Sequence, residues 1–299
     1  MEPAQHPDAV ESCSIMLNKR SLLGSILTYI FAILLAIVVL APPIWMFISS
    51  ISTQAQLIEL PLKWWPEEPS FYRYIAIATE SGNSAAATFR QAVINSIIVG
   101  LTVTLICVST GSLAAYSSSR LHFKGQSTVM FVMLFSYMLP PILIVVPLFV
   151  IMNSLGLLDS KLSLIITYSA LLMPFAVWTL KGFFDTIPSE LEDAARIDGC
   201  THLGALFRVV LPLSAPGIAA ASLLTFILSW EEFFIALIFT SSPASKTIPV
   251  GISEFTDRFQ IDYPFMATGG VIAALIPVAL CIIFQKGLIK GLTAGAVKG

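Results

Sequence analysis

Six long apolar runs constrain this chain more than any other feature of its sequence. Each is long enough to cross a bilayer as a helix, which needs about 20 mostly apolar residues. They cover residues 22–49, 92–117, 127–152, 162–183, 214–240 and 266–289. Charged residues occupy only 11% of the 299 positions, against about 25% in soluble domains. We therefore predict an all-α, polytopic membrane protein with six transmembrane helices.

The distribution of lysine and arginine predicts the orientation of these spans. With the N-terminus inside, ten lie on the inner side: Lys19, Arg20, Arg120, Lys124, Lys181, Arg196, Arg208, Lys286, Lys290 and Lys298. Six lie on the outer side: Lys63, Arg73, Arg90, Lys161, Lys246 and Arg258. We predict a multi-pass protein of the cytoplasmic (inner) membrane, with both termini and the 184–213 loop in the cytoplasm.

The apolar runs leave room for one membrane domain with a short segment at each end. We expect a cytoplasmic N-terminal segment over 1–21, a transmembrane domain over 22–290 and a cytoplasmic tail over 291–299. The first 21 residues are too acidic and too many for the positively charged start of a signal peptide. The first apolar run is therefore expected to remain as an anchor.

Several classes of function are disfavoured by the composition. A net charge of −2 without a basic run does not suggest nucleic-acid binding. The four cysteines (Cys13, Cys107, Cys200 and Cys281) are far apart and have no metal-ligand spacing, so we expect neither disulfides nor a metal site. The three histidines (His6, His122 and His202) fall outside the predicted spans, and no nucleophile–base arrangement stands out. We predict no catalytic residues, which argues against a membrane enzyme.

Prolines occur in most of the spans, where each removes a backbone donor and bends its helix. Most are interpreted as static kinks. Pro140 and Pro141 are the best candidates for a hinge, because two prolines stand together in the middle of the third run.

The loop between the fourth and fifth runs contains an unusually polar helical segment. Ser189 and Glu192, after Pro188, have the S-x-x-E form of a capping box. Gly199 suits the left-handed position that ends a helix. A second short helix is expected over about 201–210, before Leu211-Pro212.

One face of the first of these helices is small and apolar. Leu191, Ala194, Ala195 and Asp198 share it, at spacings of three and four residues. A face of this kind fits into a shallow protein groove, with Asp193 and Arg196 beside it able to pair with charges on the rim. The alternative is an amphipathic helix lying on the lipid surface, although adjacent alanines bury little area there.

At this loop the sequence resembles the ATP-binding-cassette (ABC) importer permeases, whose loop reads Glu-Ala-Ala, three residues, Gly, nine residues, Ile, one residue, Leu-Pro. Here Asp193-Ala194-Ala195, Gly199, Val209 and Leu211-Pro212 match in register, with Asp in place of Glu and Val in place of Ile. Further matching motifs follow in order: Asn95-Ser96, Ala114-Ala115-Tyr116 before Arg120, Pro147-Leu148-Phe149, Leu155-Gly156-Leu157, and Pro174-Phe175 with Trp178. The C-terminal residues 291–299 are similar to the tail of the second (G-type) permease of maltose-type carbohydrate importers.

This resemblance implies a coupling helix that docks on a separate ATP-binding subunit, with Asp193 paired to a base there. The coupling residues it implies are Asp193, Ala194, Ala195, Arg196, Asp198, Gly199, Leu211 and Pro212. The tail it implies as a contact with the ATP-binding pair consists of Ala294, Gly295, Ala296, Val297, Lys298 and Gly299.

The resemblance also implies the other components of the importer. These are a second permease, a dimer of ATP-binding subunits, an extracytoplasmic sugar-binding protein, and a carbohydrate or related polyol as substrate. The sequence has no G-x-x-x-x-G-K-[ST] motif. ATP and Mg are therefore expected on the partner ATPase.

Glu231 and Glu232 follow Trp230 inside the fifth apolar run. An acid at the centre of a bilayer costs on the order of 2.5–3.5 kcal/mol on insertion scales. These three residues are candidates for the translocation path, where one acid would accept from substrate hydroxyls and the other would bond across the subunit interface. Two other interpretations stay open: structural acids near the outer end of the span, and the proton site of an ion-gradient-driven secondary transporter.

Overall fold

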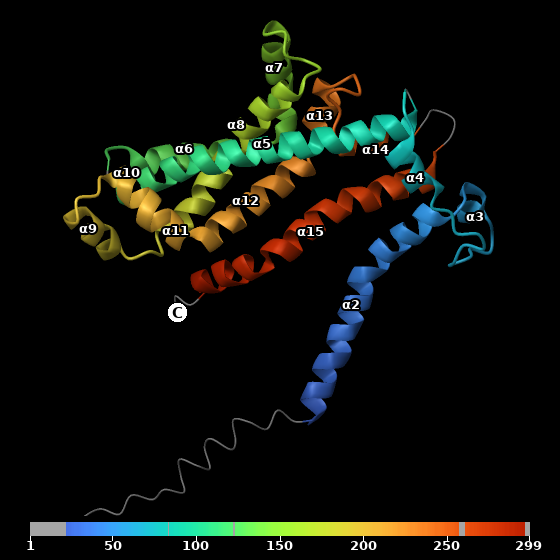
Figure 1. Cartoon of the computed structure of the whole chain (residues 1–299), viewed down its shortest axis with the longest axis horizontal. Helices are drawn as coiled ribbons and strands as arrows, with labels where there is room; N and C mark the ends of the chain where they lie inside the picture. Colours follow the sequence, from blue (N-terminus) through green and yellow to red (C-terminus); the bar gives the residue numbers. More distant parts are fainter. Residues whose placement is uncertain (1–21, 83, 122, 257–260, 297–299) are drawn as a thin grey trace, which may run out of the picture.

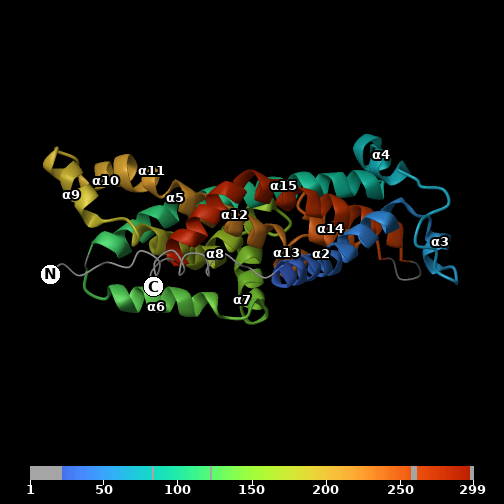
Figure 2. The same ribbon diagram turned by 90° about the horizontal axis from the view of Figure 1, so that it is seen from below.

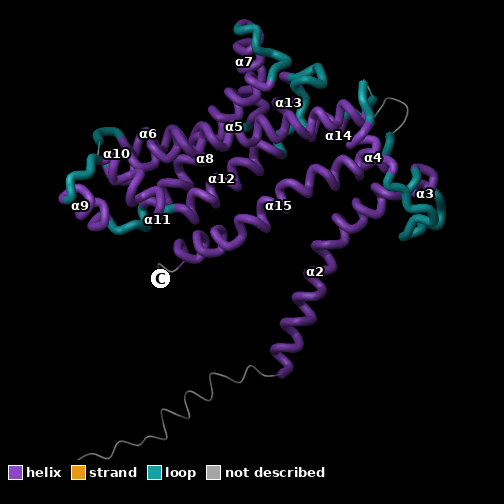
Figure 3. The backbone as a smooth tube through the Cα atoms, in the orientation of Figure 1, coloured by secondary structure: helices purple, strands orange, loops and turns teal. Residues whose placement is uncertain are grey.

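The computed structural model describes residues 22–82, 84–121, 123–256 and 261–296 of the chain. Helices account for nearly all of its regular structure, as Figure 3 shows. Within the described ranges there is no strand, only an isolated antiparallel bridge between Thr256 and Ile261. The predicted all-α class is therefore confirmed.

Four helices are each long and apolar enough to span a membrane: α2 (Leu22–Ile51), α5 (Ala85–Arg120), α8 (Lys161–Phe184) and α15 (Tyr263–Ala296). Two further candidates are bent pairs. The first joins α6 (Gln126–Tyr137) to α7 (Pro141–Ser154) at 93°. The second joins the helical segment 202–213 to α12 (Ala215–Trp230) at 80°. The described residues thus contain six spans if each bent pair counts as one.

Short helices occupy the connections between the spans. On the loop before α12 lie α9 (Ser189–Ile197), α10 (His202–Ala205), the π-helix η1 (Leu206–Val210) and α11 (Leu211–Leu213). The remaining short helices are α3 (Gln54–Ile58), α4 (Tyr72–Thr79), α13 (Phe234–Phe239) and α14 (Ile248–Ser253).

Two of the predicted spans are not continuous helices. The third run breaks before Pro141, which begins α7, because proline cannot donate to the preceding turn and its ring clashes with it. In the fifth run, helix α12 ends at Trp230, and the next helix, α13, begins at Phe234. The expected hinge at Pro140-Pro141 coincides with the 93° bend.

The spans form an elongated bundle with connections gathered at its two ends. In Figures 1 and 2, α9 and α10 lie at one end, and α3 and α4 lie at the other. Helix α5 runs most of the length between these ends and packs against α8 and α12, while α15 lies beside α12.

Helix α2 departs from this bundle, as Figure 1 shows. Every residue from 26 to 44 is exposed, whereas Ser50 and Ile51 near its C-terminal end are buried. The apolar faces of its first half are therefore left for lipid or another chain.

Two glycines permit close approach of α12 to its neighbours. A Cβ on Gly100 of α5 would lie 2.9 Å from the Phe226 ring of α12. A Cβ on Gly217 of α12 would lie 2.2 Å from the Phe183 ring of α8. Small residues of this kind let membrane helices pack closely, and here they link α5, α12 and α8.

At the end that carries α4 and α14, the loop between α13 and α14 is held by α5. The Asn95 side chain donates to the carbonyls of Pro243 (3.0 Å) and Lys246 (2.9 Å). The Ser96 hydroxyl accepts from the Ile248 N–H at 2.8 Å. This loop is therefore fixed to the start of α5.

Asp159, in the turn between α7 and α8, also holds this loop. Its Oδ1 accepts from the N–H groups of Ser241 and Ser242, each at 2.9 Å, and from the Ser245 hydroxyl. Burial alone would raise the pKa of Asp159, but these hydrogen bonds outweigh burial and hold the pKa below its ordinary value. The stabilisation is therefore present above the ordinary carboxyl pKa, and is lost as the pH falls through the lowered value.

We predict that Asp159→Ala destabilises this loop by about 1–3 kcal/mol, because it leaves three donors without their acceptor. Asp159→Asn is the matched control, since its amide oxygen can still accept from them. Thermal unfolding of the purified protein, together with proteolysis within 241–246, measures the effect. Equal stability of the wild type and the alanine variant would contradict this account.

Candidate functional site

Helix α9 begins one residue after Pro188, but the predicted capping box is absent. Pro188 occupies the N-cap position, and no side chain caps the helix. Glu192 instead turns into the protein and is 5% exposed, where Arg120 and Tyr116 donate to its carboxylate. The box prediction was wrong because a buried charge-assisted contact is stronger than a local cap on an exposed turn.

The end of α9 is as predicted. Gly199 has φ +90°, a conformation that a side chain would strain. Its N–H donates to the Arg196 carbonyl and the Cys200 N–H donates to the Ala195 carbonyl, both at 3.0 Å. These two bonds form a Schellman motif, which closes the helix and turns the chain sharply.

The second predicted helix is present but longer and less regular than expected. Thr201 caps α10 by accepting from the Gly204 N–H at 3.1 Å. The helix then widens into η1 and continues to Leu213, past the predicted end at Leu211-Pro212. Leu206 and Val210 of η1 are fully buried against α5 and α8. This helical segment therefore anchors α9 to the bundle.

The predicted docking face of α9 is free in this structure. Leu191, Ala194 and Asp198 are exposed, and Ala195 is half-buried. Asp193 and Arg196, beside this face, are also exposed and lie 3.8 Å apart as a weak ion pair. Their charges are thus available to a partner.

Ile197 extends this free surface, and sequence analysis did not single it out. It is 86% exposed at the end of α9, and Leu203 and Phe207 nearby along the chain are exposed as well. An isolated isoleucine in a polar helix was the available sequence signal. The end of α9 therefore presents an exposed apolar side chain close to the charges of Asp193 and Arg196.

The three residues predicted for the translocation path lie close together but have different surroundings. Trp230 is buried, and its indole N–H donates to the Ala273 carbonyl of α15 at 3.1 Å. Glu231 is exposed, at the C-terminal end of α12. Trp230 therefore secures α12 to α15, whereas Glu231 is accessible.

Glu232 lies in the break between α12 and α13 and caps α13. Its two carboxylate oxygens accept from the N–H groups of Ile235 (2.8 Å) and Ala236 (3.2 Å). The buried Tyr168 hydroxyl of α8 also donates to it, at 2.5 Å. A carboxylate at a helix N-terminus satisfies free amides and opposes the positive end of the helix dipole. Tyr168 was not foreseen, because a contact across 64 residues leaves no local signal.

Both helix breaks border one cavity of about 300 Å³. Tyr137, Leu139 and Pro141 come from the break between α6 and α7, and Glu232 comes from the break after α12. At membrane depth, non-helical backbone is tolerated where it is buried in protein or lines a water-filled cavity. This cavity is therefore the best candidate in the described chain for part of a translocation path.

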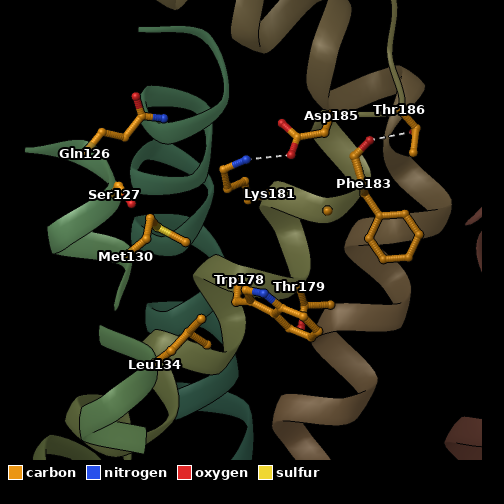
Figure 4. A pocket seen from close by; sticks show the side chains of 11 residues that line it. Gln126, Ser127, Met130, Leu134, Trp178, Thr179, Lys181, Phe183, Asp185 and Thr186 are labelled. Atoms are coloured by element: carbon orange, nitrogen blue, oxygen red, sulfur yellow. Dashed lines mark hydrogen bonds and ion pairs between the residues drawn. The ribbon is translucent and has the colours of Figure 1, made fainter. Parts of the chain in front are cut away.

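A larger cavity of about 730 Å³ lies between α6 and α8, near the end that carries α9 (Figure 4). Its lining includes Lys181, which pairs with Asp185 at 2.6 Å, together with Met130 and Trp178. No residue of α6 is buried. Helix α6 is therefore packed less tightly than α5 or α8.

Half of the predicted tail contact falls outside what the structure describes. Ala294, Gly295 and Ala296 end the backbone of α15, and Val297, Lys298 and Gly299 lie outside the described residues. The role of the tail therefore stays a prediction.

The sequence matches the family described as the binding-protein-dependent transport system inner membrane component, over residues 107–294. This match spans both candidate sites. The chain belongs to this family. It is thus an inner-membrane permease component of an ABC importer, a class that the loop at 193–212 had predicted, and the match does not support the secondary-transporter alternative.

Similar proteins extend this result over nearly the whole chain. A sulfoquinovosyl glycerol transport system permease of Agrobacterium fabrum is 38% identical, over 92% of this chain and 95% of its own length. A trehalose/maltose transport system permease of Thermococcus litoralis is 35% identical, over 94% and 99%. In fold, the chain resembles a crystal structure of a bacterial ABC transporter involved in alginate import, with a TM-score of 0.70, 22% identity, and coverage of 95% and 99%.

We predict that Gly199→Val disorders the end of α9, because valine is strained at φ +90°. The cost is about 1–2 kcal/mol, enough to expose the loop to limited proteolysis. Gly199→Asn is the matched control, since asparagine tolerates the left-handed region better. Identical cleavage of the two variants within 184–213 would refute the requirement for glycine.

Proposed function

We propose that this chain is one of two permease subunits of an ATP-driven importer for a carbohydrate or related polyol. The substrate class is supported by the similar permeases, which are named for sulfoquinovosyl glycerol and for trehalose and maltose. A second permease, an ATP-binding pair and an extracytoplasmic binding protein complete the importer. ATP and Mg are held by the ATP-binding pair, because this chain has no phosphate-binding loop motif.

The single observation that carries this proposal is that the docking face of α9 is exposed while the helical segment 202–213 next to it is packed into the protein. Asp193 and Arg196 stand exposed, while that segment is packed against α5 and α8. A partner that grips α9 from the cytoplasm therefore moves the membrane helices with it. In this orientation, the lysine- and arginine-rich side and both termini are cytoplasmic.

The transport cycle follows from this arrangement. A sugar-loaded binding protein docks on the outer loops, ATP closes the ATP-binding pair, and α9 carries that motion into the bundle. The path opens outward and accepts the sugar, and hydrolysis returns it to face inward. The chain supplies a path and a coupling element and performs no covalent chemistry.

Glu231 does not line the 300 Å³ cavity that Glu232 borders, but it is exposed next to it in the chain, and we expect it to accept hydrogen bonds from sugar hydroxyls at the entrance to the path. Glu232 already accepts three hydrogen bonds from its own chain, so its role is to hold the break between α12 and α13 in shape. The two adjacent acids therefore have separate tasks.

Replacing Asp193 by lysine tests the docking role. It reverses an exposed charge on α9. We therefore expect the amount of co-purifying ATPase to fall at least 10-fold, while the permease remains in the membrane. Glu190→Lys, on the same exposed helix but outside the docking motif, is the matched control. Wild-type ATPase recovery and uptake in Asp193→Lys would overturn the docking proposal.

Replacing each acid of the pair by glutamine separates their tasks. Glu231→Gln should leave complex yield and thermal stability unchanged but alter the KM for sugar uptake, because the residue has no structural partner in the described chain. Glu232→Gln should lower the thermal stability of the complex, because an amide cannot accept all three bonds. Tyr168→Phe removes only one of these bonds and should be milder. Normal yield, stability and uptake in both glutamine variants would refute the assignment.

Identification of the substrate needs the assembled importer. The tagged chain is purified from its native membrane with ATP and vanadate, and its partners are identified by mass spectrometry. Recovery of a second permease and an ATPase, with a binding protein whose ligand is a sugar, supports the proposal. Recovery of the chain alone, active under an ion gradient, would refute it.

A further inference from the structure

Arg120, the last residue of α5, contacts three separate parts of the chain. Its Nε donates to Glu192 Oε1 of α9. Its Nη2 donates to the carbonyls of Phe184 (3.0 Å) and Ile187 (2.7 Å), at the end of α8 and in the following turn. One guanidinium thus joins the ends of α5 and α8 to α9.

Glu192 has a second partner on α5. The Tyr116 hydroxyl donates to its Oε2 at 3.0 Å, one helical turn before Arg120. Both carboxylate oxygens are therefore bound by the same helix, at two points. The side chains of Arg120 and Glu192 are only 15% and 6% exposed.

Burial makes these contacts difficult to give up. Separating a buried pair leaves a charge without its partner in a poorly solvated place, which is more costly than losing an exposed ion pair. The guanidinium is also suited to the task, because its fixed fork of donors can serve a carboxylate and two carbonyls at once. A lysine has the charge but not the fork.

The neighbouring acid behaves in the opposite way. Asp193 directly follows Glu192, yet its side chain is 66% exposed. Consecutive residues point about 100° apart on a helix. Helix α9 therefore presents one acid outward to a partner and one inward to its own chain.

We propose that Arg120, Glu192 and Tyr116 form a clamp that makes α9 and the adjoining ends of α5 and α8 move as one body. This inference rests on the proposed coupling function. Asp193 would bind the ATP-binding partner, whereas Glu192 and Arg120 would pass the resulting displacement to the membrane helices. They are positioning residues, which touch neither substrate nor nucleotide.

The remaining contacts of the loop separate the clamp from docking. Leu206 and Val210 are held against α5 and α8 by apolar packing, so we expect them to stay buried when Glu192 is changed, and we expect the Schellman turn at Gly199 to persist. A chain without the clamp therefore still presents α9 to its partner, but the connection from α9 to α5 is looser. Loss of the clamp is expected to uncouple hydrolysis from transport without loss of assembly.

The test uses the full importer reconstituted in proteoliposomes. Glu192→Gln and Arg120→Lys are compared with the wild type, with Tyr116→Phe as the mildest change. The readout is the number of sugar molecules taken up per ATP hydrolysed, in samples matched for co-purified ATPase. We expect this ratio to fall at least 3-fold in the first two variants while hydrolysis continues. An unchanged ratio in both would overturn the clamp.

A distance measurement keeps the proposal falsifiable if these variants assemble poorly. Spin labels are placed at the exposed Glu190 of α9, outside the docking motif, and at the exposed Leu113 of α5, in the assembled importer that is otherwise wild type. A clamped unit gives one narrow distance that is the same without nucleotide and with ATP and vanadate. A distance that changes between these states in the wild type would refute the clamp.

The two proposals fail in different ways. If Asp193→Lys retains its ATPase and wild-type uptake, the docking role is wrong. If Asp193→Lys loses its ATPase but Glu192→Gln keeps a wild-type ratio of uptake to hydrolysis, docking stands and the clamp alone is wrong.

Discussion

The packing of α5 against α8 and α12 fixes the relative positions of the two ends of this permease. At one end, Asn95 and Ser96 of α5 fix the loop before α14. At the other, Arg120 fixes α9 and the end of α8. The close glycine–phenylalanine contacts between α5, α12 and α8 leave little space for these helices to slide past one another. The positions of the two ends are therefore coupled through the packed helices α5, α8 and α12.

Features with a local physical cause could be predicted from the sequence. The apolar runs had to be helices, because a bilayer offers no partner for free backbone groups. Gly199 could be placed as a helix stop, because only a residue without a side chain adopts its conformation without strain. The free face of α9 could be predicted as well, since the spacing of Leu191, Ala194 and Asp198 fixes their direction on the helix.

Features that depend on distant partners could not be predicted. Glu192 matched a local capping box, yet its partner Arg120 lies 72 residues away in the sequence. Glu232 could be a path residue or a structural acid from its sequence context, and the structure shows it as the cap of a short helix and the acceptor of Tyr168. In both cases a side chain on another helix donates to the carboxylate, and the local sequence does not reveal it. Hydropathy also concealed the break after Trp230, because the residues on both sides of it are apolar.

Helix α5 alone among the four long continuous spans contains no proline. From Asn95 to Arg120 it runs roughly 37 Å without a built-in bend, which exceeds the thickness of the hydrocarbon core. A helix without a proline kink transmits a displacement equally well in either direction. In the proposed importer, nucleotide binding that moves α9 changes the affinity of the outer loop for its ligand. Binding of that ligand changes the affinity for nucleotide by the same factor, because coupling between two sites is reciprocal. Under the proposed function, α5 therefore couples the binding of a ligand at the outer loop to the nucleotide state of the ATP-binding partner.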